Sequence, residues 1–330
     1  MLTGTGDVIQ GGTLNIGSGC TMAPIRGENG EFHGLGGACS HCYAMAVTAG
    51  LDKKFKGMAA QLRQAGKEDR AQQLEQMYDG TTKTVNGIEV WTGKVIPHPH
   101  RIAEFLRKTA VKPWFVSSCT DFWHDGYSDE YLAEWWAAFA VNPNQRILLL
   151  TKRPGRQRER LSDPSWINLV KEKAQGHLTA NPHAKHLSMP DEWPLPNVWT
   201  GASAGQHEAL VHVLKDLLYT PSACQWLSLE PLYADVKLGE AMAEYSPEDR
   251  SKLKWAIFGG ESGPRSRPMD LEWVRTGLKA CRDLGISPFV KQKGEVLAKA
   301  LNCVDKKGGD ITEWPEDVRV REYPGDTASS

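Results

Sequence analysis

The chain has 330 residues, 40% of them hydrophobic, which is enough for the core of one large domain or two ordinary ones. Its 39 basic and 40 acidic residues leave a formal charge of -1, which excludes a global positive field that would recruit nucleic acid. There is no apolar run of the roughly 20 residues that span a bilayer, and no secretory signal, so we expect a cytoplasmic protein with no membrane partner.

The stretch "TLNIG" predicts a short first strand, and residues 51–86 predict an exposed charged helix inserted before the next strand. From residue 88 onward, short β-rich runs alternate with amphipathic helical stretches. The predicted strands cover residues 90–96, 113–118, 145–151, 197–203, 225–231, 254–260 and 287–292. The predicted helices between them include residues 101–110, 128–141, 208–219 and 271–285, with Ser128 as an N-cap and Gly285 as a C-terminal glycine cap.

Most of these strands are too uniformly apolar to have a solvated face. Buried parallel strands joined by helices predict an α/β fold, either a parallel barrel or a doubly wound sheet. Polar and glycine residues recur where the strands end, and a barrel places its active site at that rim. The sequence therefore predicts a rim site in residues 1–300, followed by a surface extension at 301–330.

Seven cysteines are spread along the chain, and their odd number argues against a disulfide framework. Three of them, Cys20, Cys39 and Cys42, form a Cys-x18-Cys-x2-Cys set just before a predicted helix. A CxxC pair alone fits a redox disulfide, half of a zinc site or part of an iron-sulfur site. Structural zinc requires four ligands, for which His33 or His41 is available, whereas a four-iron cluster held by three thiolates leaves one iron open.

Motifs along nearly the whole chain carry a resemblance to a known family. They are "SGC" (18–20), "CSHCYA" (39–44), "LLLTKRP" (148–154), "VWTGAS" (198–203), "LSLEPL" (227–232), "IFGGESGPRSRPM" (257–269) and "FVKQKG" (289–294). In these motifs and their order the chain resembles a phage-associated family of the radical S-adenosyl-L-methionine (radical SAM) superfamily, catalogued as a domain of unknown function. The spacing between the first two cysteines is longer than is usual there, and an inserted loop, residues 21–38, accounts for it.

The resemblance implies a (β/α) TIM-like full or partial barrel of the radical SAM type, with an N-terminal cluster-binding loop at residues 18–45. It implies a 4Fe–4S cluster on Cys20, Cys39 and Cys42, S-adenosyl-L-methionine on the open iron, and a flavodoxin-type or other one-electron reductant. Rim position alone suggests the SAM contacts, which we predict at Trp91, Thr92, Gly93, Ser118, Thr151, Lys152 and Thr200.

The resemblance also implies a substrate, because family members act in thymidine hypermodification of phage DNA, which protects that DNA from host restriction. The expected reaction isomerises N-α-glycyl-thymidine to C-α-glycyl-thymidine in modified DNA, in the host cytoplasm if the chain is phage-encoded. The candidate catalytic residues are Glu230, Glu261 and Lys291, and the candidate substrate-binding residues are Arg265, Arg267 and Lys293. Trp123 and His124 at a strand end are a further candidate pair.

Two alternatives remain open from the sequence. One is a radical SAM repair or modification enzyme that acts on another nucleic-acid or peptide substrate. The other, of a different class, is a non-catalytic binding protein stabilised by zinc.

Overall fold

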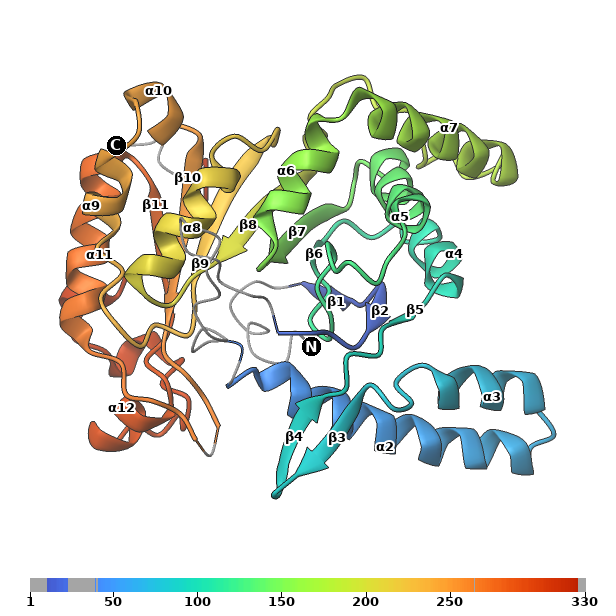
Figure 1. Cartoon of the computed structure of the whole chain (residues 1–330), viewed down its shortest axis with the longest axis horizontal. Helices are drawn as coiled ribbons and strands as arrows, with labels where there is room; N and C mark the ends of the chain where they lie inside the picture. The colour runs from blue at the N-terminus through green and yellow to red at the C-terminus, as the bar shows by residue number, and fades with distance from the viewer. Residues whose placement is uncertain (1–10, 23–38, 40, 264, 326–330) are drawn as a thin grey trace. The chain divides into compact units, whose positions relative to one another are not determined.

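The computed structural model describes residues 11–22, 39, 41–263 and 265–325. These residues divide into two compact units, whose elements are labelled in Figure 1. The first unit contains residues 11–22, 42–149 and 163–193, and the second contains residues 39, 41, 150–162, 194–263 and 265–325. Cys20 and Cys42 are assigned to the first unit, and Cys39 to the second.

The first unit is built mainly of helices around a few short strands. Its strands are β1 (Gly12–Leu14), β2 (Gly17–Ser18), β3 (Thr82–Val85), β4 (Ile88–Trp91), β5 (Ile96–Pro97), β6 (Pro113–Val116) and most of β7 (Arg146–Thr151). Its helices are α2 (Tyr43–Gln64), α3 (Glu68–Gln76), α4 (His100–Leu106), α5 (Asp129–Val141) and α7 (Pro164–Ala180).

The second unit alternates longer strands with helices. Its strands are β8 (Val198–Ser203), β9 (Cys224–Leu229), β10 (Leu253–Gly259) and β11 (Ser287–Gln292). Its helices are α6 (Pro154–Ser162), α8 (His207–Leu217), α9 (Leu238–Ala243), α10 (Pro247–Arg250), α11 (Leu271–Leu284) and α12 (Glu295–Ala300), and two 3₁₀ turns follow, η1 (Ile311–Glu313) and η2 (Glu316–Val318).

Seven strands form one sheet in the order β1-β6-β7-β8-β9-β10-β11. Pairing is parallel within the first unit, from β1 through β6 to β7, and within the second, from β8 through β11. Strands that neighbour one another in chain order are typical of a (β/α) barrel, whereas a doubly wound sheet reverses its order part-way. The fold is therefore α/β, with the strand order of a partial (β/α) barrel, which confirms the predicted class.

Strands β8 and β9 are buried on both faces, as their apolar sequences predict. Because side chains alternate along a strand, one face carries Trp226 and the other carries Leu227. The tryptophan face is an aromatic layer in which Trp255 contacts the rings of Trp226 and Phe289. The opposite face packs on α8, α9 and α11.

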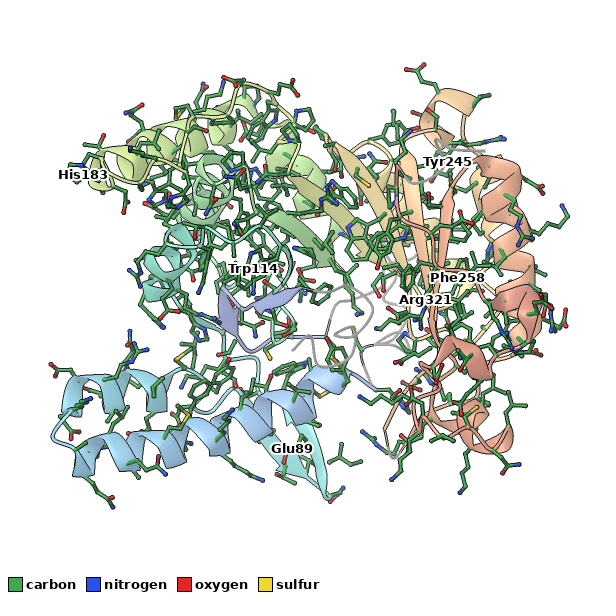
Figure 2. The ribbon with its side chains drawn as sticks, turned by 180° about the vertical axis from the view of Figure 1, so that it is seen from behind. Glu89, Trp114, His183, Tyr245, Phe258 and Arg321 are labelled. Atoms are coloured by element: carbon green, nitrogen blue, oxygen red, sulfur yellow. The ribbon has the colours of Figure 1, made fainter. Side chains whose placement is uncertain are left out.

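Helix ends follow the predicted capping. Ser128 accepts a hydrogen bond from the amide of Tyr131 at the start of α5, and Gly285 ends α11 in the left-handed conformation, with φ of 67°. Phe258, labelled in Figure 2, lies so close to Gly277 of α11 that a Cβ on Gly277 would be 2.3 Å from the Phe258 ring.

Of the helices that the structure describes, none is long and apolar enough to cross a membrane.

Two predicted elements are wrong. The run 90–96 is not one strand, because a turn at Gly93, with φ of 92°, divides it. Its first part belongs to the antiparallel β3–β4 hairpin, and Ile96 pairs with Ser18 in a separate two-stranded sheet. Likewise, residues 51–86 are not one helix, since α2 ends before Gly66, with φ of 69°, and α3 folds back beside it (Figure 1).

The C-terminal segment is an integral part of the second unit. Trp314 is buried and Trp255 donates from Nε1 to the carbonyl of Glu322, at 2.9 Å. Arg321, labelled in Figure 2, bridges to Phe289 and donates from Nε to the carbonyl of Val290, at 3.1 Å. Residues 303–323 therefore cover the edge strand β11, which protects its backbone from pairing with another chain.

Candidate functional site

The "SGC" turn that carries Cys20 is fixed by its backbone. Gly19 has φ of 85°, and a Cβ at this position would lie 2.0 Å from the carbonyl oxygen of Lys94, so only glycine fits. The amide of Gly19 donates to the carbonyl of Cys119 at 3.1 Å, and the Thr120 hydroxyl donates to the carbonyl of Gly19 at 2.7 Å. The loop after β6 thus holds the residue that precedes Cys20.

A buried histidine holds the residue that follows Cys20. His124 is 5% exposed, and its Nε2 lies 3.0 Å from the amide nitrogen and 2.9 Å from the hydroxyl of Thr21. The other ring nitrogen, Nδ1, accepts from the amide of Gly126 at 2.9 Å. Both neighbours of Cys20 are therefore anchored to the segment 119–126, while the cysteine itself stays partly exposed.

Cys42 is the N-cap residue of α2, and the first turn of this helix contains no acidic residue. Helix N-termini favour negative charge, so this position suits a thiolate. Close to it lies Cys119, a thiol in the apolar cluster beneath α2. Burial, above all, raises the pKa of Cys119, with a smaller contribution from the charge of Cys42. Cys119 is accordingly a neutral, structural thiol.

Cys39 and His41 belong to the second unit, where Glu261 and Arg267 form a buried ion pair. Glu261 is 7% exposed, and its Oε2 accepts from the amide and from Nε of Arg267, both at 2.9 Å. The guanidinium also lies 3.9 Å from the ring centroid of Tyr233. His41 Nδ1 is 3.7 Å from Glu261 Oε1, so the segment between the two CxxC cysteines contacts this pair.

A second ion pair joins the ends of two strands in the same unit. Lys291 Nζ lies 2.9 Å from Glu230 Oε1, with side-chain exposures of 12% and 14%. The strand between them, β10, ends at Gly259, where a Cβ would lie 2.2 Å from the same carboxylate oxygen. Ser228 donates to the other oxygen at 3.3 Å. Glycine at 259 thus lets Glu230 reach across β10 to Lys291.

Comparison with known proteins places this chain in a family. A family model described as "Protein of unknown function (DUF5131)" matches residues 29–315. The chain belongs to the DUF5131 family. The matched range includes Cys39 and Cys42 and begins after Cys20. No curated protein and no solved structure matches the chain.

In this DUF5131 chain all seven cysteines are described, and each carries a thiol. Cys20, Cys39, Cys42 and Cys303 are partly exposed, whereas Cys119, Cys224 and Cys281 are buried. Three accessible thiols are the donor type that iron-sulfur clusters use, so the residues fit the predicted cluster chemically. Across the described ranges, no group of three or more His, Cys, Asp and Glu side chains is arranged to hold a metal ion, and the cluster stays a prediction.

The SAM contacts predicted from rim position lie in different settings. Ser118 and Thr151 lie at strand ends, where the Ser118 hydroxyl donates to Asn15 Oδ1 at 3.2 Å and Thr151 Oγ1 accepts from the amide of Arg153 at 2.8 Å. Lys152 follows directly, half-buried. Trp91, Thr92 and Gly93 belong to the β3–β4 hairpin and the turn after it, outside the seven-stranded sheet.

For Thr200 the predicted rim position is wrong. It lies inside β8, three residues before Ser203 ends the strand. Because side chains alternate, it shares the face of Ala202, which packs on the helices. Ser203 is the residue at the rim, and its hydroxyl donates to the carbonyl of Glu230 at 3.3 Å.

The predicted substrate-binding residues also differ in setting. Arg265 is exposed, and Arg267 is held by Glu261 and Tyr233. Lys293 is fully buried, and its Nζ donates to Cys303 Sγ at 3.1 Å and to the carbonyl of Glu313 at 2.9 Å. These contacts tie β11 to the C-terminal segment, and a role of Lys293 in substrate binding stays a prediction that would require breaking them.

Sequence reasoning missed two residues of this DUF5131 site. Asn15 follows β1, and its Oδ1 accepts from the amide of Cys119 at 3.1 Å. The rule that polar residues at strand ends form the rim would have identified it, had it been applied to the first strand. Tyr233 has no such signal, because its role depends on stacking with Arg267, which is 34 positions later in the chain.

Proposed function

We propose that the chain is a radical SAM enzyme in which Cys20, Cys39 and Cys42 hold a 4Fe–4S cluster. The observation that carries this proposal is that all three cysteines of the N-terminal motif are partly exposed on a parallel α/β fold, while three of the other four are buried. Three thiolates leave one iron of a four-iron cluster without a protein ligand, which is where SAM binds in the superfamily that the motifs resemble.

When bound, the cluster and SAM supply one-electron cleavage of SAM and abstraction of a hydrogen atom from the substrate. Residues of the chain itself position the segments that carry Cys20 and Cys42. Gly19, Thr120 and His124 fix the turn that carries Cys20, and the N-terminus of α2 favours the thiolate form of Cys42. These hydrogen bonds fix the turn on both sides of Cys20.

Glu230 and Lys291 are suited to hold a small zwitterion. A glycyl group carries an amine and a carboxylate, and an ion pair of opposite polarity can exchange partners with it. Lys291 would bind the glycyl carboxylate, and Glu230 would bind the amine. Overall, the bond from the thymine methylene moves from the nitrogen to the glycyl α-carbon, and one hydrogen moves from that carbon to the nitrogen. Because both side chains are largely buried, this exchange would take place with little competition from water.

The proposed substrate, N-α-glycyl-thymidine in DNA, requires only a short contact with the polynucleotide. A formal net charge of -1 is consistent with a few phosphate contacts rather than a long duplex footprint. The segment 152–160, in and before α6, concentrates basic side chains, namely Lys152, Arg153, Arg156, Arg158 and Arg160, against the single acid Glu159. It is the strongest local candidate for such contacts.

Nucleoside mass spectrometry tests the reaction. DNA that carries N-α-glycyl-thymidine is incubated anaerobically with reduced protein and SAM, and its nucleosides are separated. We expect a product of unchanged mass and altered retention, formed by the wild type and by Cys224→Ala, which removes a buried thiol. Cys39→Ala should form neither this product nor 5′-deoxyadenosine. SAM cleavage without a new nucleoside would reject the substrate, and absence of both activities would reject the enzyme class.

A further inference from the structure

The "GGESGPRSRP" stretch is predicted to supply the catalytic Glu261 and the substrate-binding Arg265 and Arg267, but the geometry of Glu261 and Arg267 points to another role. We propose that Glu261, Arg267 and Tyr233 form a clamp that positions the CxxC segment for cluster binding. This inference rests on the proposed function, since it gives these three residues a task at the same cysteine site.

The backbone of Glu261 is fixed before its side chain acts. Gly260 approaches β11 so closely that a Cβ would lie 2.3 Å from the carbonyl oxygen of Lys293, so glycine is required there. The Gly260 amide donates to the carbonyl of Gln292 at 2.9 Å, and the amide of Glu295 donates to the carbonyl of Glu261 at the same distance. The carboxylate therefore projects from a rigid strand end.

The Glu261 carboxylate is bound by Arg267. It accepts from the arginine amide, from Nε at 2.9 Å and from Nη2 at 3.1 Å, which is a bidentate fork with a backbone bond added. The guanidinium is stacked 3.9 Å from the Tyr233 ring centroid, and the Arg267 side chain is 27% exposed. The Glu261 carboxylate binds one edge of this guanidinium, and the Tyr233 ring covers one of its faces. A guanidinium bound in this way is suited to positioning a neighbouring segment rather than to binding a substrate.

This rigid group contacts the cysteine motif. Glu261 Oε1 lies 3.7 Å from Nδ1 of His41, which stands one residue before Cys42 and two after Cys39. Burial is the main cause of the raised pKa of Tyr233, and the electrostatic interactions of this side chain include those with Arg267 and Cys39. Groups that contact ligand-bearing segments orient the ligands, and their loss typically weakens metal binding about 10- to 100-fold.

Two variants and a control test the clamp. Glu261→Gln keeps the shape of the side chain and removes its charge, and Arg267→Lys keeps the charge and removes the bidentate fork. Arg275→Lys makes the same exchange in an exposed ion pair with Asp317 and serves as the matched control. In protein loaded with iron and sulfide, both test variants should lose iron to a chelator about 10-fold faster than the wild type or more, at equal folded content by circular dichroism. Arg275→Lys should release iron at the wild-type rate.

A second readout needs no iron. In the apoprotein, alkylation of Cys39 by iodoacetamide is followed by peptide mass spectrometry, with the partly exposed Cys303 as an internal reference. Both test variants should speed alkylation of Cys39 several-fold and leave Cys303 unchanged. Wild-type rates at Cys39 in both variants would overturn the clamp, even if the protein binds iron. If the wild type binds no iron but Cys39 is alkylated faster in both variants, the clamp is retained and the proposed function is rejected.

Discussion

The strand ends of the two units are built from different chemistry. In the first unit the loop after β6 is held by neutral groups, the Asn15 amide, the Thr120 hydroxyl and the His124 imidazole, all bonded to backbone or hydroxyl atoms. In the second unit the ends of β9, β10 and β11 carry the ion pairs Glu230–Lys291 and Glu261–Arg267. Hydrogen bonds between neutral groups fix a segment without adding charge to it. Ion pairs can orient charged groups, or exchange partners with them.

Breaking the buried ion pair Glu230–Lys291 should have the largest effect. Lys291→Met leaves the Glu230 carboxylate largely buried without its cation, and such a change typically destabilises by about 4 kcal/mol. The free energy of unfolding in urea measures it. The double variant Glu230→Gln with Lys291→Met should recover much of this loss, and failure to recover any would show that the ion pair is not the cause.

Acid should test the contribution of His98, a buried histidine of the first unit. Burial lowers the pKa of His98 from its ordinary 6.5 to about 4, and its Nε2 lies 2.8 Å from the carbonyl of Met77. Between these pH values the unfolded chain binds a proton that the folded chain does not. Stability is therefore fully present above about pH 6.5 and is lost, by about 3 kcal/mol, as the pH falls toward 4.

Urea unfolding at a series of pH values measures this loss. His98→Gln keeps a donor for the Met77 carbonyl and does not titrate, so its stability should depend less on pH over the same range. An unchanged slope in His98→Gln would mean that another group is responsible.

Removing one neutral hydroxyl should have a smaller effect. Thr120→Val deletes the hydroxyl that donates to the Gly19 carbonyl and lies 3.0 Å from the Tyr127 hydroxyl, and the loss of each such bond costs about 1 kcal/mol. The matched control is Thr179→Val, whose hydroxyl donates to the carbonyl of Gln175 on the exposed side of α7. Thr120→Val should also retain less iron after loading, whereas equal retention in the two variants would separate Thr120 from the cysteine site.

An exposed ion pair gives the smallest expected effect. Lys279 Nζ and Asp283 Oδ2 on α11 are 2.6 Å apart, and the two side chains are 77% and 60% exposed. Exposed pairs of this kind are screened by water and contribute little. Lys279→Met should therefore leave the urea midpoint unchanged, and a shift as large as that of Lys291→Met would show that burial does not distinguish the two lysines.

Much of the sheet was predictable because its strands are continuous apolar runs, and so were the caps at Ser128 and Gly285, whose signals are local. The prediction of one strand at 90–96 was wrong because one long strand and two short strands contain the same β-forming residues. Only the turn at Gly93 distinguishes the two structures. Thr200 misled for a related reason, since a strand end must be known before the face of each residue can be assigned.

The candidate site was predictable only in part. Glu230, Glu261 and Lys291 were identified because each lies where a buried strand ends. Their partners were not, because ion pairing depends on which strands are neighbours and on the glycines that admit a side chain. Gly259 lets Glu230 cross β10, and no periodicity in the sequence signals that contact.

Electron paramagnetic resonance of the reduced protein tests the central claim, three thiolates around an open iron, most directly. Protein is purified anaerobically, analysed for iron and sulfide, reduced and measured with and without SAM. We predict about four irons per chain and a cluster signal that changes when SAM is added, since SAM would coordinate the open iron. A cluster signal that SAM leaves unaltered, or a colourless protein with one zinc per chain, would contradict the account.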